Sequence, residues 1–163
     1  MNGLIMNMKN MLSGLILSVL LISCGGESSE TSSSGQETTT NESGLTNFEL
    51  EHGIGPVTEV VELGPLDEEL AAEGKQVFEA KCTACHKPHE RYIGPATEDI
   101  LNRRSPTYVM NMIMNPDEMT KEHPEGRKMM QEYMSPMPFQ NVTVEQARAI
   151  VEYFRTIEPE PEN

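Results

Sequence analysis

The chain has 163 residues and is strongly acidic, with 26 Asp and Glu against 12 Lys and Arg and a formal net charge of −14 at pH 7. This excess of negative charge argues against a nucleic-acid partner, because nucleic acids are bound by basic surfaces. The length leaves room for one modest hydrophobic core rather than for several large domains.

Residues 1–23 are predicted to be an export signal. Lys9 precedes an apolar stretch, residues 11–22, that is too short to span a bilayer comfortably and is typical of a signal-peptide core. The stretch runs into Leu-Ile-Ser-Cys at residues 21–24, which resembles the lipobox of bacterial lipoproteins. That resemblance implies a lipid-modified Cys24 at the mature N-terminus and a protein anchored to the bacterial cell envelope, facing the periplasm, with the inner or outer membrane left open. The alternative is an ordinary signal peptide that leaves a free thiol, but the polar tract that follows fits a lipoprotein tether better.

Two segments without helical signals come next. Residues 24–47 consist mostly of Gly, Ser, Thr, Glu, Gln and Asn after the cysteine, a composition that buries too little apolar surface to fold, so we expect a disordered linker. Residues 48–66 contain a Gly-Ile-Gly-Pro turn followed by several valines, and we expect an extended strap that packs on the domain. The remainder, residues 67–163, is predicted to form one domain.

Four helical segments are predicted within this domain, and no stretch resembles a strand. Each begins at residues that favour a helix N-terminus and carries apolar side chains at helical spacing. They run from Asp67 to Lys81, from Ser105-Pro106 to Asn115, from Pro124 towards Tyr133, and from a capping box at residues 143–146 to a point before Pro159. The predicted fold is all-α, with about four to five helices.

The most informative motif is Cys-Thr-Ala-Cys-His at residues 82–86. Two thiols at this spacing, followed at once by an imidazole, are the attachment signature of c-type haem. Cys82 and Cys85 would form thioethers with the haem vinyl groups, and His86 would supply one axial nitrogen to the iron. The motif therefore predicts one covalent haem c as cofactor and electron transfer as the leading function. With two cysteines on haem and Cys24 on lipid, none is left for a disulfide.

Two other kinds of functional site could be built from the same cysteines and histidines. A zinc cluster could take Cys82, Cys85, His86 and His89, but structural zinc sites usually divide their ligands between two pairs a dozen or so residues apart. A thioredoxin-like Cys-x-x-Cys pair needs a strand, a helix and a parallel sheet around it, and no strand is predicted here.

The region from about Leu66 to Ile157 resembles class I cytochrome c of the small monohaem type. Gly74 and Phe78 stand eight and four residues before Cys82, like the residues of the family's first helix that let the N- and C-terminal helices cross closely. The resemblance implies an all-helical fold around one haem. Their partners on the last helix would be Ile150 and either Tyr153 or Phe154.

The same resemblance implies two further roles. Pro95, in a Gly-Pro pair after the haem motif, would accept through its carbonyl a hydrogen bond from the second ring nitrogen of His86, although a simple turn would explain the same residue types. Met137, in the Ser-Pro-Met-Pro-Phe segment before the last helix, would be the sixth iron ligand. Met134 is its main competitor, and a histidine or an open site is the third possibility. His52, His89 and His123 are expected at the surface or in loops.

A filled sixth position leaves no site for oxygen or peroxide, so we expect an electron carrier rather than an enzyme. The expected partners are redox proteins, with a quinol-oxidising complex as donor and a terminal reductase or oxidase as acceptor, and the protein is expected to be a monomer. The alternative is a haem enzyme or sensor, similar to a small peroxidase, with an open or displaceable sixth ligand. The range from Lys81 to Arg104 contains five basic residues and three acidic ones. We therefore expect the surface on the haem side to be less acidic than the rest of the protein. Charges scattered over the solvated surface would give the same counts.

Overall fold

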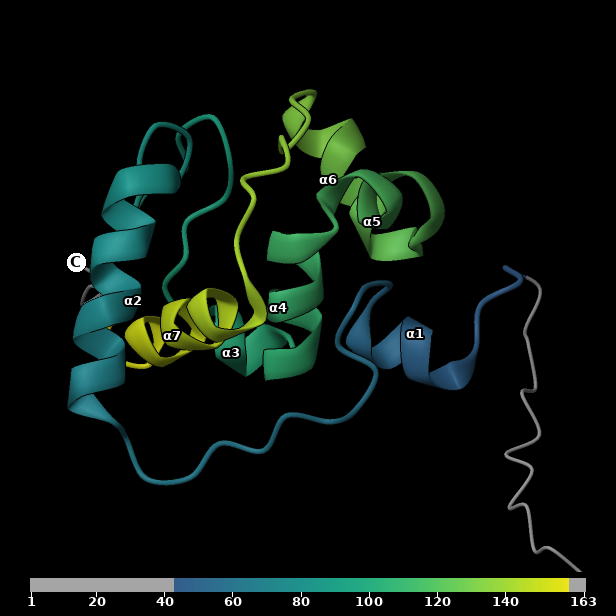
Figure 1. Cartoon of the computed structure of the whole chain (residues 1–163). Coiled ribbons are helices and arrows are strands. Elements are labelled where there is room, and N and C mark those ends of the chain that lie inside the picture. Colours follow the sequence, from purple (N-terminus) through teal and green to yellow (C-terminus); the bar gives the residue numbers. More distant parts are fainter. Residues whose placement is uncertain (1–42, 159–163) are drawn as a thin grey trace, which may run out of the picture. The chain divides into compact units, whose positions relative to one another are not determined.

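The computed structural model describes residues 43–158, which belong to one compact unit of the chain (Figure 1). The predicted signal peptide, Cys24 and most of the predicted linker lie outside the described residues. The described part contains seven helices and no strand, which confirms the predicted all-α fold but exceeds the expected number of helices. None of the helices between residues 43 and 158 has the length and apolar character that a membrane span needs.

Four helices lie where the sequence predicts them, and three shorter ones are additional. The predicted helices are α2 (Glu68–Lys81), α4 (Pro106–Met114), α6 (Pro124–Tyr133) and α7 (Val144–Phe154). The additional helices are α1 (Asn47–His52), α3 (Ile100–Arg103) and α5 (Pro116–Glu122). The side chains of Asp67, Ser105 and Thr143 cap α2, α4 and α7 by accepting hydrogen bonds from backbone N–H groups of the first turn.

The N-terminal boundary of the folded part differs from the prediction, because α1 lies where the sequence predicts the end of a linker and an extended strap. Thr46 and Glu49 form a capping box at its start: the Thr46 hydroxyl accepts from the Glu49 N–H at 3.1 Å, and the Glu49 carboxylate accepts from the Thr46 N–H at 2.8 Å. Leu45 is buried in a cluster with Tyr108 and Met119. Within the described residues, packed structure therefore already includes Leu45, three residues before the predicted start of the strap at residue 48.

Residues 53–66 connect α1 to α2 without regular secondary structure and pack along the domain (Figure 1). Asn111 of α4, which is fully buried, holds this segment by its backbone. Its amide nitrogen donates to the carbonyls of His52 and Val57 at 3.0 Å each, and its carbonyl oxygen accepts from the Val57 N–H at 3.0 Å. Further hydrogen bonds join the Thr107 hydroxyl to the Val61 N–H and the Glu152 carboxylate to the Asp67 N–H.

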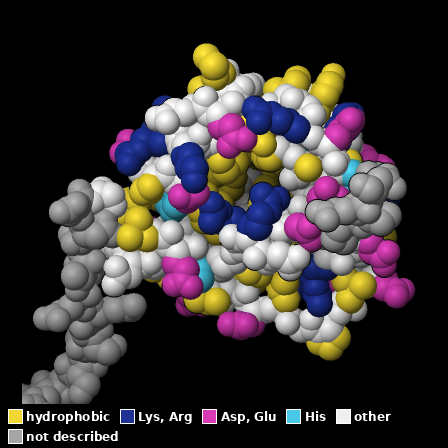
Figure 2. All heavy atoms as spheres, turned by 180° about the vertical axis from the view of Figure 1, so that it is seen from behind, with side chains coloured by type: hydrophobic (Ala, Val, Ile, Leu, Met, Phe, Trp, Pro, Cys, Tyr) yellow, Lys and Arg dark blue, Asp and Glu magenta, His cyan; other side chains and the backbone are white. Residues whose placement is uncertain are grey.

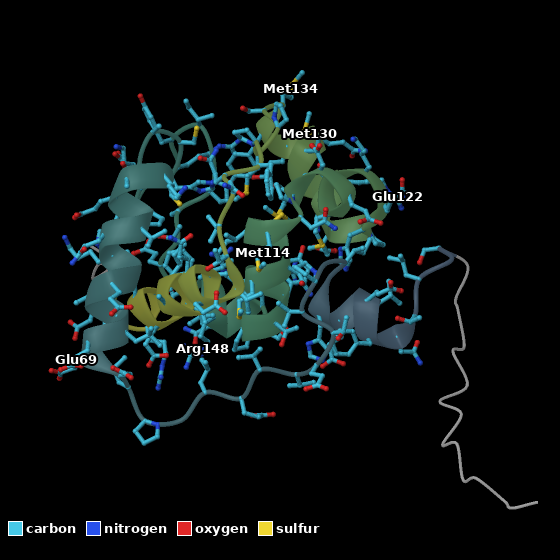
Figure 3. The ribbon with its side chains drawn as sticks, in the orientation of Figure 1. Glu69, Met114, Glu122, Met130, Met134 and Arg148 are labelled. Atoms are coloured by element: carbon cyan, nitrogen blue, oxygen red, sulfur yellow. The ribbon has the colours of Figure 1, made fainter. Side chains whose placement is uncertain are left out.

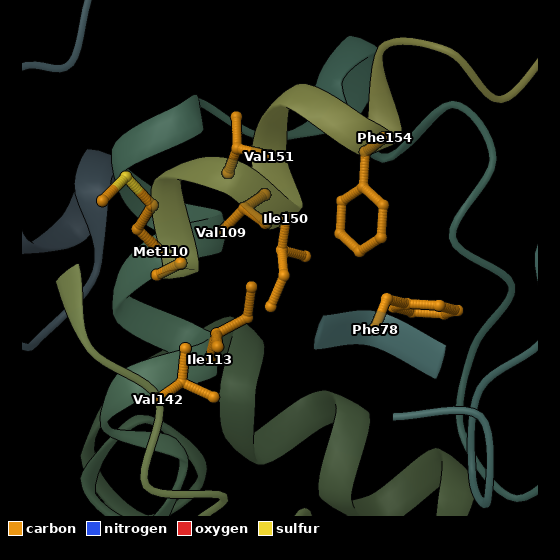
Figure 4. Packing of buried hydrophobic residues seen from close by; sticks show 9 residues of the cluster. Phe78, Val109, Met110, Ile113, Val142, Ile150, Val151 and Phe154 are labelled. Carbon is orange, nitrogen blue, oxygen red and sulfur yellow. The ribbon is translucent and has the colours of Figure 1, made fainter. Parts of the chain in front are cut away.

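The main core lies where α2, α4 and α7 meet (Figure 4). Phe78 of α2 contacts the α7 side, where its ring meets that of Phe154 edge-on with centroids 5.6 Å apart, and Ile150 is fully buried beside them. The buried Gly74 faces the backbone of α7. The helices named by the resemblance thus cross at the expected positions, and this crossing fixes the end of α2, from which the haem-attachment motif continues.

Candidate functional site

A cavity of about 680 Å³, counting the part open to solvent, lies beside the end of α2. Residues from α4, α5 and α6 and from two loops line it, and most of them are apolar. Figure 2 shows one face of the molecule with a hollow whose floor is hydrophobic and whose surroundings carry Lys and Arg side chains. The lining residues are Lys81, Cys82, Cys85, His86, Ile93, Gly94, Pro95, Met112, Thr120, Met129, Met130, Tyr133, Ser135, Pro136, Met137, Pro138 and Gln140.

The Cys-Thr-Ala-Cys-His motif turns directly off the C-terminus of α2. Cys82 caps the helix, with its N–H bonded to the Phe78 carbonyl at 2.8 Å, and its own carbonyl accepts from the N–H groups of Cys85 and His86 at 3.0 and 2.9 Å. This turn brings all three reactive side chains of the motif to the same cavity. A rigid helix therefore positions the two thiols and the imidazole together.

His86 is fixed by its second ring nitrogen. Nδ1 lies 3.0 Å from the carbonyl oxygen of Pro95, and since a carbonyl oxygen only accepts, Nδ1 carries the proton and donates. The lone pair then lies on Nε2, the nitrogen available to a metal, and the hydrogen bond makes the ring a better electron donor. Gly94 lies so close to the imidazole that a Cβ there would be 2.5 Å from its Cε1 atom. The contact between His86 and Pro95 is the one that the resemblance implies.

The two methionines considered for the sixth ligand position, Met137 and Met134, differ in their location and exposure. Met137 lines the cavity and packs against both buried clusters. Met134 ends α6 in a left-handed conformation with φ 50° and is 84% exposed, pointing away from the body of the molecule (Figure 3). Sequence reasoning did not single out three other methionines of the lining, because their helical spacing is that of ordinary core residues. These are Met112, Met129 and Met130.

The geometry does not support the two alternative uses of the cysteines. Among the described residues, no group of three or more His, Cys, Asp or Glu side chains is placed to hold a metal ion, and His89 instead has its Nδ1 2.8 Å from the Glu98 carboxylate. Burial raises the pKa of the Cys82 thiol to about 11. A redox-active Cys-x-x-Cys pair needs a lowered thiol pKa, so the environment of Cys82 is opposite to what that chemistry requires.

Two of the remaining histidines are not where the sequence predicts them. His52 and His123 are buried, with 8% and 1% exposure. His52 Nδ1 lies 2.9 Å from the Ser105 hydroxyl, and His123 caps α6 and contacts the Leu50 carbonyl. Neither lines the cavity. Both are structural residues that join α1 to the helices around it.

The residues around the cavity fit a covalent haem. Two thiols suit thioether bonds, one nitrogen and one thioether sulfur suit the axial positions of iron, and the apolar walls suit a porphyrin face. His86 is held in the orientation and tautomer that metal ligation requires.

Comparisons with known proteins agree with this chemistry. The sequence model described as cytochrome c matches residues 71–158. A search of curated proteins finds no match. Among solved structures, the cytochrome c from Rhodothermus marinus is similar at 45% identity and a TM-score of 0.63, over 67% of this chain and 94% of that one.

Two engineered forms of the Rhodothermus marinus cytochrome c are similar as well. One has 43% identity and a TM-score of 0.63, and the other, described as bound to a carbene intermediate, has 44% identity and a TM-score of 0.61. Each match covers 67% of this chain and 95% of the other. The family match spans more than half of the chain, and the solved relatives align over almost their whole length. The chain therefore belongs to the cytochrome c family, whose cofactor is covalent haem c and whose chemistry is haem-based electron transfer.

Proposed function

We propose that this cytochrome c is a membrane-tethered carrier of single electrons that faces the periplasm, with His86 and Met137 as axial ligands of the iron. Cys82 and Cys85 hold the haem through thioethers. The haem supplies the redox chemistry, and the protein supplies its orientation, its ligands and its surroundings.

The observation that carries this proposal is the placement of His86 and Met137 on one cavity. Met137 lies between two prolines, so its segment has little freedom to move. A thioether ligand raises the reduction potential of haem iron relative to a second histidine, and a filled sixth position leaves no site for oxygen or peroxide. An outer-sphere electron carrier follows from both effects.

The composition of the cavity wall supports a carrier over a small peroxidase or a sensor. Apart from His86, the lining contains no histidine, aspartate or glutamate. A haem enzyme that cleaves peroxide needs a general acid or base within reach of the open iron position. The side of the cavity that carries Met137 offers mostly methionines and prolines, with Tyr133, Ser135 and Gln140 as its polar side chains.

The rim of the cavity supports docking to redox partners. Ile93, which lines the cavity, is 44% exposed, its neighbour Tyr92 is 57% exposed, and Phe139 in the methionine segment is 60% exposed. Exposed apolar side chains next to a cofactor suit a transient protein contact. We infer a donor that oxidises quinol and an acceptor that is a terminal reductase or oxidase, with the carrier acting as a monomer.

The ligation is tested by replacing each methionine in the haem-loaded protein. In Met137→Ala the sulfur-to-iron absorption band of the ferric protein should disappear, the reduction potential should fall, and cyanide or carbon monoxide should bind. Met134→Ala should leave all three unchanged, because Met134 is exposed. Loss of the band in Met134→Ala instead, or in Met130→Ala, would assign the sixth ligand elsewhere.

The tether is tested separately. Cys24→Ala should release the protein from membranes or block its processing, because no other segment proposed here would hold it to a lipid surface. Normal processing of Cys24→Ala, together with a parent protein that fractionates away from membranes, would overturn the lipid anchor while leaving the haem chemistry untouched.

A further inference from the structure

The segment that carries Met137 has few attachments of its own. Pro136 and Pro138 stiffen it, but a proline also lacks the backbone N–H that could bond it to a neighbour. In the described part of the chain, the backbone of residues 135–137 makes no hydrogen bond to another protein group. The position of Met137 therefore depends on side-chain packing, and Met137 packs against both buried clusters of the domain.

One of these clusters is built in part by residues 45–54, which we call the N-terminal brace. The brace contains α1 and the residues that flank it, and Figure 1 shows α1 beside α4. Leu45 and Ile54 of the brace are two of the five buried members of this second cluster, and Leu50 packs against it, as Met137 does. The other buried members, from α4 and α5, are Tyr108, Met112 and Met119.

The second cluster also backs the wall of the cavity. Met112 is a buried member of the cluster and lines the cavity at the same time. Met129 and Met137, which line the cavity too, pack against the cluster. The leucine and isoleucine side chains of the brace are not among the lining residues. The brace therefore lies one layer behind the wall that carries Met137.

Hydrogen bonds hold the brace firmly in this place. The Ile54 N–H donates to the Met119 sulfur at 3.0 Å, and the Ile54 carbonyl accepts from the Asn115 side chain at 3.2 Å. A Cβ on Gly53 would lie 2.9 Å from Cε of Met119, so the backbone of the brace touches this fully buried methionine. The Leu50 carbonyl is bonded to the His123 ring at 3.2 Å. The backing of the cavity wall is thus fixed at both ends of the brace.

We propose that the N-terminal brace is a positioning element for the sixth iron ligand, in which Leu50 and Ile54 keep Met137 in place through the second cluster. The inference rests on the proposed ligation by Met137. Protein interiors are close-packed and transmit strain, so a void behind Met112 lets the wall and Met137 move away from the haem. A fraction of the molecules then has an open sixth position. Leu50 and Ile54 are positioning residues, because they act on the iron only through other side chains.

Leu63 offers a matched comparison for Leu50. It lies in the segment between α1 and α2, is half-buried like Leu50, and packs against the main core cluster. Its neighbour Gly64 accepts a hydrogen bond from Arg155, the C-cap of α7, at 2.9 Å. Met137, in contrast, precedes the first residue of α7. Leu63→Ala therefore removes the same atoms as Leu50→Ala, but at the opposite end of α7.

The test measures how readily cyanide binds to the ferric, haem-loaded protein. Cyanide binds where Met137 has left the iron, so its apparent affinity is proportional to the fraction of molecules with an open sixth position. Leu50→Ala and Ile54→Ala should each raise this affinity about tenfold. They should also weaken the sulfur-to-iron band and lower the reduction potential. Ile54→Val removes a single methylene group and leaves the smallest void, so it should stay close to the parent in all three measurements.

Thermal unfolding of the same variants separates ligand positioning from general stability. Leu63→Ala should lower the melting temperature as Leu50→Ala does, yet keep the cyanide affinity, the band and the potential of the parent. An equal rise of cyanide affinity in Leu63→Ala would overturn the proposal, because the effect would then follow from stability alone. Lower melting temperatures of Leu50→Ala and Ile54→Ala with unchanged cyanide affinity would overturn it as well, since the brace would then only stabilise the fold.

Met137→Ala distinguishes this inference from the proposed ligation. In a Met137→Ala background the sixth position is already open, so adding Leu50→Ala should give no further rise in cyanide affinity, and the two effects should be strongly non-additive. If Met137→Ala loses the band but the two effects add, the brace is overturned and the ligation stands. If Met137→Ala keeps the band, both proposals are overturned together.

Discussion

Gly74 of α2 lies against the backbone of Ala149 of α7, so closely that a Cβ at residue 74 would lie 1.9 Å from the Ala149 carbonyl oxygen. The contact is with backbone and not with the end of a flexible side chain, so it cannot be relieved by a rotamer change. The distance between the two helices therefore depends on a glycine at this position. Because α2 ends in the haem-attachment motif, the same contact sets where Cys82 and His86 lie.

Gly74→Ala is expected to force α2 and α7 apart. Inserting a methyl group into a packed interface costs about 1–3 kcal/mol of stability. Because the added Cβ would clash with a backbone carbonyl, we expect the loss of stability in Gly74→Ala to reach or exceed the upper end of this range. Thermal unfolding of the haem-loaded protein measures the loss. Gly64→Ala is the matched control, because a Cβ there meets nothing within 4 Å; equal melting temperatures for the two variants would contradict the close approach.

Local signals in the sequence were sufficient for the four main helices. Caps at Asp67, Ser105 and Thr143 act on the first turn of their own helix, so their effect does not depend on the rest of the fold. The haem motif is equally local, since five consecutive residues carry it. The short helices α1, α3 and α5 escaped prediction because helices of four to seven residues depend on tertiary packing even where a local signal such as the Thr46–Glu49 capping box of α1 is present.

Long-range contacts could not be predicted in the same way. The hydrogen-bond partners of the two buried histidines are far away in the sequence. The partner of His123 is the Leu50 carbonyl, about seventy residues away, and that of His52 is the Ser105 hydroxyl, about fifty residues away. The contact of Arg104 with the buried Tyr108 ring has no sequence signal either, since a tyrosine in an apolar helix face is ordinarily a core residue. The exposure that favours Met137 over Met134 as the proposed sixth ligand depends on how α6 ends.

Gly94→Ala is expected to disturb the proximal histidine without touching either thiol. A Cβ at residue 94 would lie 2.5 Å from Cε1 and 2.9 Å from Nδ1 of His86, so the ring must rotate away from the Pro95 carbonyl. With that hydrogen bond weakened, His86 becomes a poorer electron donor to the iron and the reduction potential should rise. Voltammetry of the haem-loaded protein measures the shift; a potential equal to that of the parent would show that the ring tolerates the methyl group.

Asn111→Leu is expected to release the segment between α1 and α2. The substitution keeps the volume nearly constant but leaves the backbone groups of Val57 and the His52 carbonyl without their partner. Buried unsatisfied groups cost about 1–3 kcal/mol each, so a total loss of about 2–4 kcal/mol is expected, with faster proteolytic cleavage between residues 53 and 66. Asn102→Leu, which removes only an exposed bond to Asp99, should have little effect, and similar cleavage rates in both variants would argue against Asn111 as the anchor.

His123 is expected to make the stability of the protein depend on pH in the weakly acidic range. Burial lowers the pKa of His123, against smaller opposing effects of the backbone of α1. The neutral ring donates from Nε2 to the Leu50 carbonyl at 3.2 Å and accepts from the Glu125 N–H through Nδ1 at 3.2 Å. A proton on Nδ1 would face that N–H and remove the cap of α6.

Since the folded-state pKa of His123 lies below the ordinary value of about 6.5, the contribution of His123 to stability is present in full above pH 6.5 and is lost as the pH falls below it. Chemical unfolding of the parent and of His123→Asn between pH 4.5 and 7.5 measures this. Asn retains the capping oxygen but does not titrate, so the parent should be the more stable protein at pH 7.5 and the difference should shrink towards pH 4.5, whereas a difference independent of pH would rule out a buried neutral His123.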